Sequence, residues 1–116
     1  MKPLSFKTYT FGCRVNQAET IQIENDLISA GFQPVKANQL TDIVIINSCV
    51  VTQKAEKEVR QLTRRLKREN PNCFLVLCGC AVNYWQINNF PKLSVDLCLK
   101  NEQKEKIAQI LKAINH

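Results

Sequence analysis

The sequence contains no CxxC pair, and its single histidine, His116, is the terminal residue. Structural zinc takes four ligands, usually from close cysteine pairs, so these absences disfavour a zinc-stabilised domain. No apolar run approaches the roughly 20 residues of a membrane helix, and no secretory signal is visible. Repeats, low-complexity stretches and Gly/Ser linkers are absent as well. We therefore expect a single cytoplasmic domain with no membrane partner.

Cysteine, in contrast, is abundant, with six in 116 residues. The chain is 45% hydrophobic, which is enough for a core without covalent bridges. In a reducing cytosol clustered cysteines indicate metal binding or catalysis, so we expect no disulfide partner. The 16 Lys and Arg residues outnumber the 10 Asp and Glu residues, giving a net charge of +6. This balance permits a nucleic-acid partner without proving one.

Strand and helix patterns alternate along the chain. The expected strands are 6–11, 32–36, 42–47, 74–78 and 95–99, and the expected helices are 16–30, 52–70, a short one near 83–88, and 102–115. The first helix is expected to bury Ala18, Ile21, Leu27 and Ile28 and to stop at Gly31. The strand 42–47 has four branched apolar residues in a row and is expected to be buried on both faces. The helix 52–70 is expected to be capped by Thr52 and to turn inward Ala55, Val59, Leu62 and Leu66. The last helix should present on one face Ile107, Ile110, Leu111 and Ile114. The pattern predicts an α/β fold: a doubly wound, mainly parallel five-stranded sheet of flavodoxin-like order 2-1-3-4-5, with helices on both faces.

Three cysteines each come just after a predicted strand. Cys13 follows the first strand, Cys49 the strand 42–47, and Cys80 the strand 74–78. Right-handed crossovers place the loops after parallel strands on one edge, so the three thiols should meet there. The other three cysteines, Cys73, Cys78 and Cys98, are expected to pack in the interior.

Three thiolates far apart in sequence suit an iron–sulfur cluster that leaves one iron open. A zinc-stabilised interaction domain is one alternative. Another is a small phosphocarrier-like domain with Cys13 as nucleophile, although this would leave Cys49 and Cys80 unexplained. A phosphatase loop needs an Arg six residues after its cysteine, and that position holds Glu19.

Three blocks around these cysteines resemble the N-terminal domain of radical S-adenosylmethionine methylthiotransferases. The blocks are TFGCRVNQAE at 10–19, IINSCVVT at 45–52 and GCA at 79–81. The segment 96–104 also resembles the family's closing segment, except that Lys100 stands where the family usually has Gly. The run GCRVNQ is most similar to the branch that acts on N6-threonylcarbamoyladenosine beside the tRNA anticodon. The isopentenyladenosine and ribosomal-protein branches remain alternatives.

The resemblance implies that Cys13, Cys49 and Cys80 ligate an auxiliary 4Fe-4S cluster whose open iron carries the sulfur to be transferred. It also implies that S-adenosylmethionine and a second 4Fe-4S cluster bind a separate domain through a CxxxCxxC loop. No such loop occurs in this chain. We therefore expect residues 1–116 to be a single N-terminal domain, without the radical barrel or the RNA-binding tail of its parent chain, and inactive alone.

Two further sets of residues have both a functional and a plain interpretation. Asn16 and Asn47 flank the cysteine loops and could donate hydrogen bonds to cluster sulfurs, or serve as ordinary capping and turn residues. The helix 52–70 is rich in positive charge. Its residues Lys57, Arg60, Arg64 and Arg68 could contact tRNA phosphates, or form a solvated helix face.

Overall fold

The computed structural model describes residues 4–11, 14–35, 41–48, 53–78, 95–99 and 106–114. These residues form a five-stranded parallel sheet of order β2-β1-β3-β4-β5. The strands are β1 (Ser5–Phe11), β2 (Gln33–Pro34), β3 (Ile43–Ser48), β4 (Phe74–Cys78) and β5 (Leu97–Leu99), and the helices are α1 (Arg14–Ser29), α2 (Gln53–Glu69) and α4 (Ile107–Ile114). The predicted fold class and strand order are confirmed.

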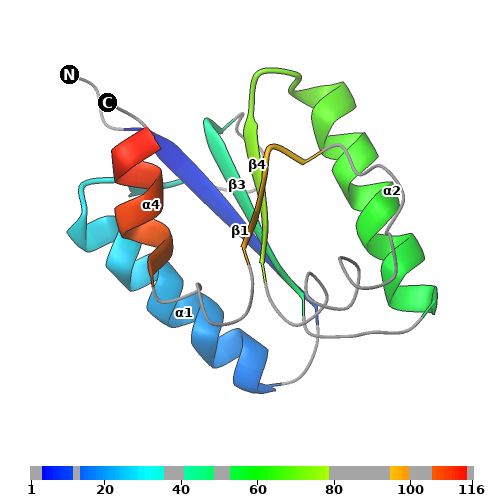
Figure 1. Ribbon diagram of the computed structural model, residues 1–116, viewed down its shortest axis with the longest axis horizontal. Coiled ribbons are helices and arrows are strands. Elements are labelled where there is room, and N and C mark those ends of the chain that lie inside the picture. The colour runs from blue at the N-terminus through cyan, green and yellow to red at the C-terminus, as the bar shows by residue number, and fades with distance from the viewer. Residues whose placement is uncertain are drawn as a thin grey trace.

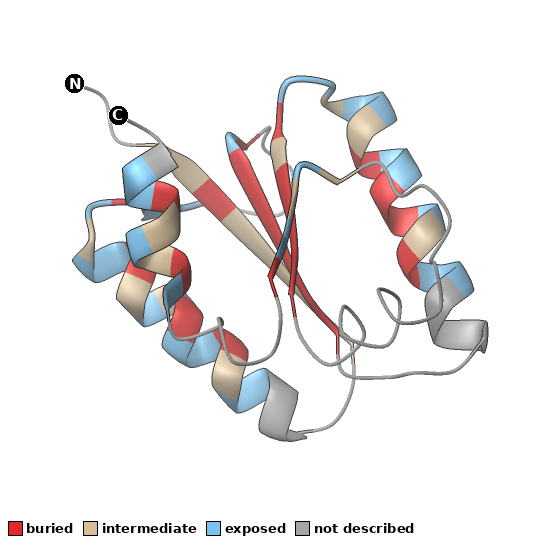
Figure 2. Cartoon of the chain, viewed as in Figure 1, coloured by how far each residue is buried: buried red, intermediate tan, exposed pale blue. Residues whose placement is uncertain are grey.

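Helices cover both faces of the sheet (Figure 1). On one face α1 and α4 pack against the sheet, and on the other face lies α2. Side chains of β3 alternate between the faces, as a strand's period of two requires. Ile43 and Ile45 join the α1/α4 core, while Val44 and Ile46 join the α2 core. All six residues of β3 are buried, which confirms the prediction of a fully covered central strand (Figure 2).

The α1 helix buries a different stripe from the predicted one. Only Leu27 of the four expected residues is in the core, whereas Ile21 and Ile28 are 58% and 49% exposed. Thr20 and Ile23 are buried instead. Apolar residues occur on two sides of this helix, and the sheet selects the side on which Thr20 can bond to polar groups of β1 and β3. The expected stop is confirmed: Gly31 has φ of 101°, and the Phe32 N–H bonds to the Leu27 carbonyl at 3.0 Å.

The α2 helix follows its predicted pattern. Val59, Leu62 and Leu66 are buried against β3 and β4. The edge strand β2 is shorter than expected, and the N–H groups of Gln33 and Val35 donate its bonds to β1. Pro34, which has no N–H, lies between them at the position that faces away from β1, where an edge strand tolerates proline. Four predictions fall outside what the structure describes: the short helix near 83–88, the cap Thr52, and the inward side chains of Ala55 and Ile114. None of the described helices is long and apolar enough to cross a membrane.

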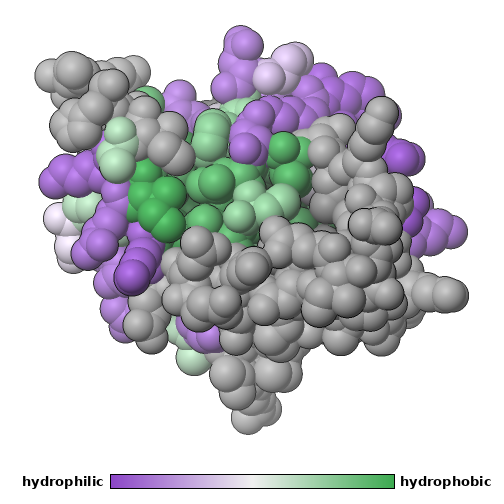
Figure 3. All heavy atoms as spheres, viewed as in Figure 1, coloured by the Kyte–Doolittle hydropathy of each residue, from purple (hydrophilic) through white to green (hydrophobic). Residues whose placement is uncertain are grey.

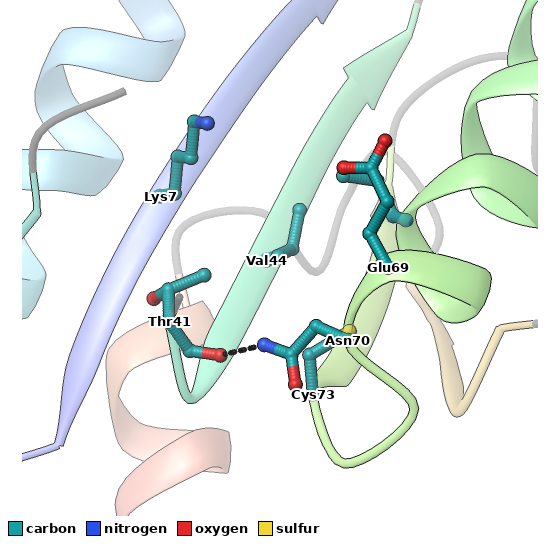
Figure 4. Close-up of a pocket in the computed structure, with 7 residues that line it drawn as sticks. Lys7, Thr41, Val44, Glu69, Asn70 and Cys73 are labelled. Atoms are coloured by element: carbon teal, nitrogen blue, oxygen red, sulfur yellow. Dashed lines mark hydrogen bonds between the residues drawn. The ribbon is translucent and has the colours of Figure 1, made fainter. Parts of the chain in front are cut away.

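The amino edge of the sheet is closed by side-chain hydrogen bonds. Asn70 donates from Nδ2 to the Thr41 carbonyl at 2.8 Å, beside a cavity of about 50 Å³ (Figure 4). The Ser5 N–H donates to an Asp42 carboxylate oxygen at 2.9 Å. A volume of this size holds water rather than a ligand. The described residues of this edge therefore fix the positions of the strands.

On the β5 side of the molecule, hydrophobic residues gather at the centre of the view, and hydrophilic residues lie to the left of them and above them (Figure 3). Strand β5 is held at its start by Asp96, whose carboxylate accepts from the Leu75 N–H at 2.7 Å and from Lys67 Nζ at 2.6 Å. Burial tends to raise the pKa of Asp96, but these two donors outweigh it and hold the pKa below its usual value.

Candidate metal centre at the carboxyl edge of the sheet

The three strands that precede the candidate cysteines end side by side. In the parallel ladder Phe11 of β1 is paired with Ser48 of β3, and Asn47 is paired with Cys78 of β4. Cys13 comes two residues after Phe11, Cys49 directly after Ser48, and Cys80 two residues after Cys78. Cys13, Cys49 and Cys80 themselves lie outside the described residues. The strand register nevertheless starts all three connections from neighbouring points of one edge, at the lower end of the sheet in Figure 1.

A buried polar network fixes α1 against this edge. Thr10 and Thr20 share a hydrogen bond between their hydroxyl oxygens at 2.8 Å, and Asn47 Nδ2 donates to Thr20 Oγ1 at 3.1 Å. Two residues earlier on β1, Thr8 donates to a Glu24 carboxylate oxygen at 2.9 Å. These bonds join β1, β3 and α1 at the point where the chain leaves β1 toward Cys13.

Asn47 is thus bonded to α1 on the face of the sheet that α1 and α4 cover, and only 1% of its surface is exposed. The bond to Thr20 commits one of its amide hydrogens, and a contact with cluster sulfur stays a prediction. The side chain of Asn16 lies outside the described set. Sequence reasoning did not identify Thr20, because a threonine in mid-helix gives no signal until the fold shows its partners.

Ser48 is the most unusual group at this edge. It is completely buried, and its hydroxyl has no hydrogen-bond partner in the part of the chain that the structure describes. A buried hydroxyl without a partner costs on the order of 1–3 kcal/mol, so proteins rarely retain one without a reason. Ser48 directly precedes Cys49 and faces the α2 side, opposite to Asn47. A thiolate or sulfide ligand next to it would give this hydroxyl an acceptor.

Helix N-termini also point to this edge. Helix α1 begins at Arg14, immediately after Cys13, and α2 begins at Gln53, four positions after Cys49. Free N–H groups in the first turn of a helix stabilise nearby negative charge. A cluster held by three thiolates is anionic. The donor chemistry at this edge therefore fits an iron–sulfur group.

The remaining cysteines divide into two kinds. Cys73 and Cys78 are buried in the core, as predicted. Cys98 is exposed, which corrects the prediction that it packs inside: on the short edge strand β5 only its neighbours Leu97 and Leu99 turn toward the α1/α4 core. Burial raises the pKa of the Cys73 thiol although the Lys67 charge acts against it, so Cys73 stays a protonated packing group.

The basic residues of α2 face different directions. Lys57 and Arg64 are exposed, and Arg60 is half-buried. Arg68 lies with Arg65 on the flank nearer β1, where both line a groove. Among the described residues, no group of three His, Cys, Asp or Glu side chains comes together as a metal site.

Comparisons with known proteins cover nearly the whole chain. The family described as Uncharacterized protein family UPF0004 matches residues 5–100, a range that includes Cys13, Cys49 and Cys80. A threonylcarbamoyladenosine tRNA methylthiotransferase of Aquifex aeolicus is 36% identical over 105 residues, covering 88% of this chain and 25% of the relative.

Two further relatives agree with this match. A threonylcarbamoyladenosine tRNA methylthiotransferase of Chlamydia pneumoniae is 40% identical over 66% of this chain and 18% of its own length. A tRNA-2-methylthio-N(6)-dimethylallyladenosine synthase of Methylacidiphilum infernorum is 34% identical over 87% of this chain and 22% of its own length. The chain thus spans about a quarter or less of the length of these relatives.

Proposed function

The chain belongs to the UPF0004 family, the N-terminal domain of tRNA methylthiotransferases, and from that premise we propose that it carries an auxiliary 4Fe-4S cluster on Cys13, Cys49 and Cys80. The observation that carries the proposal is the register of the strand ends. Phe11 pairs with Ser48, and the neighbouring Asn47 pairs with Cys78, so the three cysteines follow adjacent strands at one edge.

Two local features support a sulfur-rich anionic ligand rather than a packing role for these thiols. The buried hydroxyl of Ser48 lacks an acceptor within the described ranges, and cluster sulfur would accept from it. The first turns of α1 and α2 bring partial positive charge to the same edge. When bound, the cluster would supply an open iron that takes the sulfur to be transferred. The protein's own part is to hold three thiolates and to screen their charge.

The proposed substrate is tRNA, with N6-threonylcarbamoyladenosine beside the anticodon as the base that receives the methylthio group. Relatives named for this base and relatives named for dimethylallyladenosine both match the chain, so the matches do not choose between the two bases. The run GCRVNQ at 12–17 favours threonylcarbamoyladenosine, because it is most similar to that branch. The S-adenosylmethionine and second-cluster chemistry belong to the radical domain of the same parent chain. The 116 residues alone would hold a cluster in the cytoplasm and catalyse nothing.

Anaerobic reconstitution with iron and sulfide tests this proposal. Iron and sulfide per chain, together with the visible absorption, are measured for the wild type and for Cys13→Ala, Cys49→Ala and Cys80→Ala. We expect a cluster in the wild type and its loss in each variant. Exposed Cys98→Ala is the matched control, because it removes a thiol that is not one of the three proposed ligands. Zinc in place of iron, or equal loss in the control, would overturn the assignment.

A further inference from the structure

A groove runs between β1 and α2 on the face of the sheet that α2 covers. Helix α2 packs over β3 and β4 through Val59, Leu62 and Leu66, and this leaves the same face of β1 half-exposed beside it. The groove has a volume of about 490 Å³. Its lining consists of Tyr9, Phe11, Glu58, Gln61, Leu62, Arg65 and Arg68.

The floor of the groove is aromatic. Tyr9 and Phe11 are two residues apart on β1, so their rings project from the same face, and both are half-buried. Lys7, the preceding residue on that face, places its ammonium 5.1 Å from the centre of the Tyr9 ring. Half-exposed aromatic side chains on a sheet surface are the means by which several RNA-binding domains stack unpaired bases.

The wall of the groove is basic. Arg65 and Arg68 lie on the flank of α2 that faces β1, and among the described residues of the lining Glu58 alone is acidic. Arg65 contacts Glu69 at 3.7 Å, but the two side chains are 53% and 61% exposed. An ion pair this exposed contributes little to stability, so the guanidinium of Arg65 can leave Glu69 and bind a phosphate instead. Aromatic floor and basic wall together match a single-stranded nucleic acid, whose bases stack while its backbone meets positive charge.

The groove also leads to the candidate metal centre. Strand β1 runs from Tyr9 to Phe11 toward the carboxyl edge, and Cys13 follows Phe11 by two residues. Helix α2 runs in the opposite direction, so Arg68 in its last turn lies at the end of the groove farther from that edge. A nucleic-acid strand that enters past Arg68 and Arg65 would therefore pass over the aromatic rings toward the carboxyl edge of the sheet.

We infer that this groove binds an unpaired segment of the tRNA substrate, with a base stacked on Tyr9 or Phe11 and phosphates at Arg65 and Arg68. The inference rests on the proposed function, since it assumes an RNA substrate. It assigns the RNA contact to the flank of α2 that faces β1, rather than to all the basic residues of the helix. Of the residues that the sequence suggested for RNA contact, Arg68 lines the groove, whereas Lys57 and Arg64 are exposed outside it.

Binding of a fluorescent RNA hairpin, made of the anticodon stem and loop with an adenosine beside the anticodon, tests the groove. Anisotropy titrations at several salt concentrations give the affinity and its salt dependence. The double variant Arg65→Ala/Arg68→Ala should bind more weakly, with a slope of log K against log salt reduced by about 1.4, or about 0.7 per lost phosphate contact. The double variant Lys57→Ala/Arg64→Ala is the control, because it removes the same charge from exposed positions of the same helix.

The aromatic floor is tested by Tyr9→Leu/Phe11→Leu, which keeps apolar contact with the α2 core but removes the rings. Affinity for the hairpin should fall about fivefold or more, with the salt slope unchanged. Circular dichroism checks that the variants fold. Independently of any variant, ultraviolet cross-linking to the wild type should label the peptide that contains Tyr9 and Phe11.

Several results would overturn the inference that the groove binds RNA. They are a wild type that does not bind the hairpin, equal loss in the exposed control, binding of a fully paired duplex as tight as that of the hairpin, or a cross-link elsewhere. A dimer that dissociates in Tyr9→Leu/Phe11→Leu would instead assign the groove to a second copy of the chain. Iron content separates the two proposals: a chain that binds RNA through the groove but holds no cluster refutes the cluster alone, and the converse result refutes the groove alone.

Discussion

The two edges of the sheet treat their polar groups differently. At the amino edge the side chains of Asn70, Asp42 and Asp96 each bond to a backbone group of a neighbouring segment. At the carboxyl edge the hydroxyl of Ser48 is fully buried and has no partner within the described residues. An edge whose polar groups satisfy one another serves the fold. A buried donor of this kind, next to Cys49, supports the cluster proposed above.

The largest expected effect is on cluster binding, which should differ between a cysteine variant at the carboxyl edge and one at the amino edge. Cys49→Ala at the carboxyl edge should abolish cluster binding, whereas Cys73→Ala at the amino edge should keep the cluster. Cys73 is 2% exposed within the α2 core, so its loss should instead lower the free energy of unfolding by about 1–2 kcal/mol. Iron analysis and urea denaturation of both variants check this double dissociation. Iron loss in Cys73→Ala would remove the distinction between the edges.

A smaller effect is expected from the amino edge itself. Asn70→Ala removes the 2.8 Å bond to the Thr41 carbonyl, which joins the end of α2 to the start of β3. We expect a loss of about 1–2 kcal/mol of stability, because the carbonyl is left without this donor. Asn25→Ala, at an exposed site on α1, provides the control in the same urea titration. Equal midpoints for the two variants would show that the bond contributes nothing.

The Asp96 contacts should make the amino edge sensitive to acid. The folded-state pKa of Asp96 lies below the usual value of 3.8 for an aspartate, so its stabilisation is present above about pH 4 and is lost as the pH falls through the folded pKa. Asp96 is 36% exposed, so solvent screening limits the effect to about 1 kcal/mol or less. Thermal melts of wild type and Asp96→Asn should differ at pH 7 and converge at low pH. A constant difference at every pH would contradict this account.

The smallest effect should have the opposite sign. Ser48→Ala removes a buried hydroxyl without a partner in the described structure, so the cluster-free chain should unfold at equal or slightly higher urea concentration. In the reconstituted chain the same change should shift the reduction potential of the cluster, because a hydrogen bond to sulfur is lost. Ser48→Thr keeps the hydroxyl and is the conservative control. A clear loss of stability in cluster-free Ser48→Ala would mean that the hydroxyl already has a partner.

The sequence alone determined the strand order, the buried β3 and the inward face of α2, because β-branched runs and a strong helical period each allow one arrangement. It also determined the family, since three cysteine blocks in order carry the resemblance that the matches over 5–100 confirm. It did not determine which side of α1 is buried. Apolar residues occur on both sides of that helix, and only the hydroxyl and amide groups of Thr10 and Asn47 select the side of Thr20.

Only the tertiary structure decided which cysteines, arginines and hydroxyl groups are buried and which are exposed. Local patterns place Cys98 in a strand but do not show that an edge strand leaves it exposed. Charge along α2 gives no direction, whereas packing over β3 and β4 turns Arg65 and Arg68 toward Tyr9 and Phe11. The unpartnered hydroxyl of Ser48 likewise emerges only when strand pairing and helix packing bury it. Burial and neighbours across the sheet are long-range properties, so no pattern along the chain contains them.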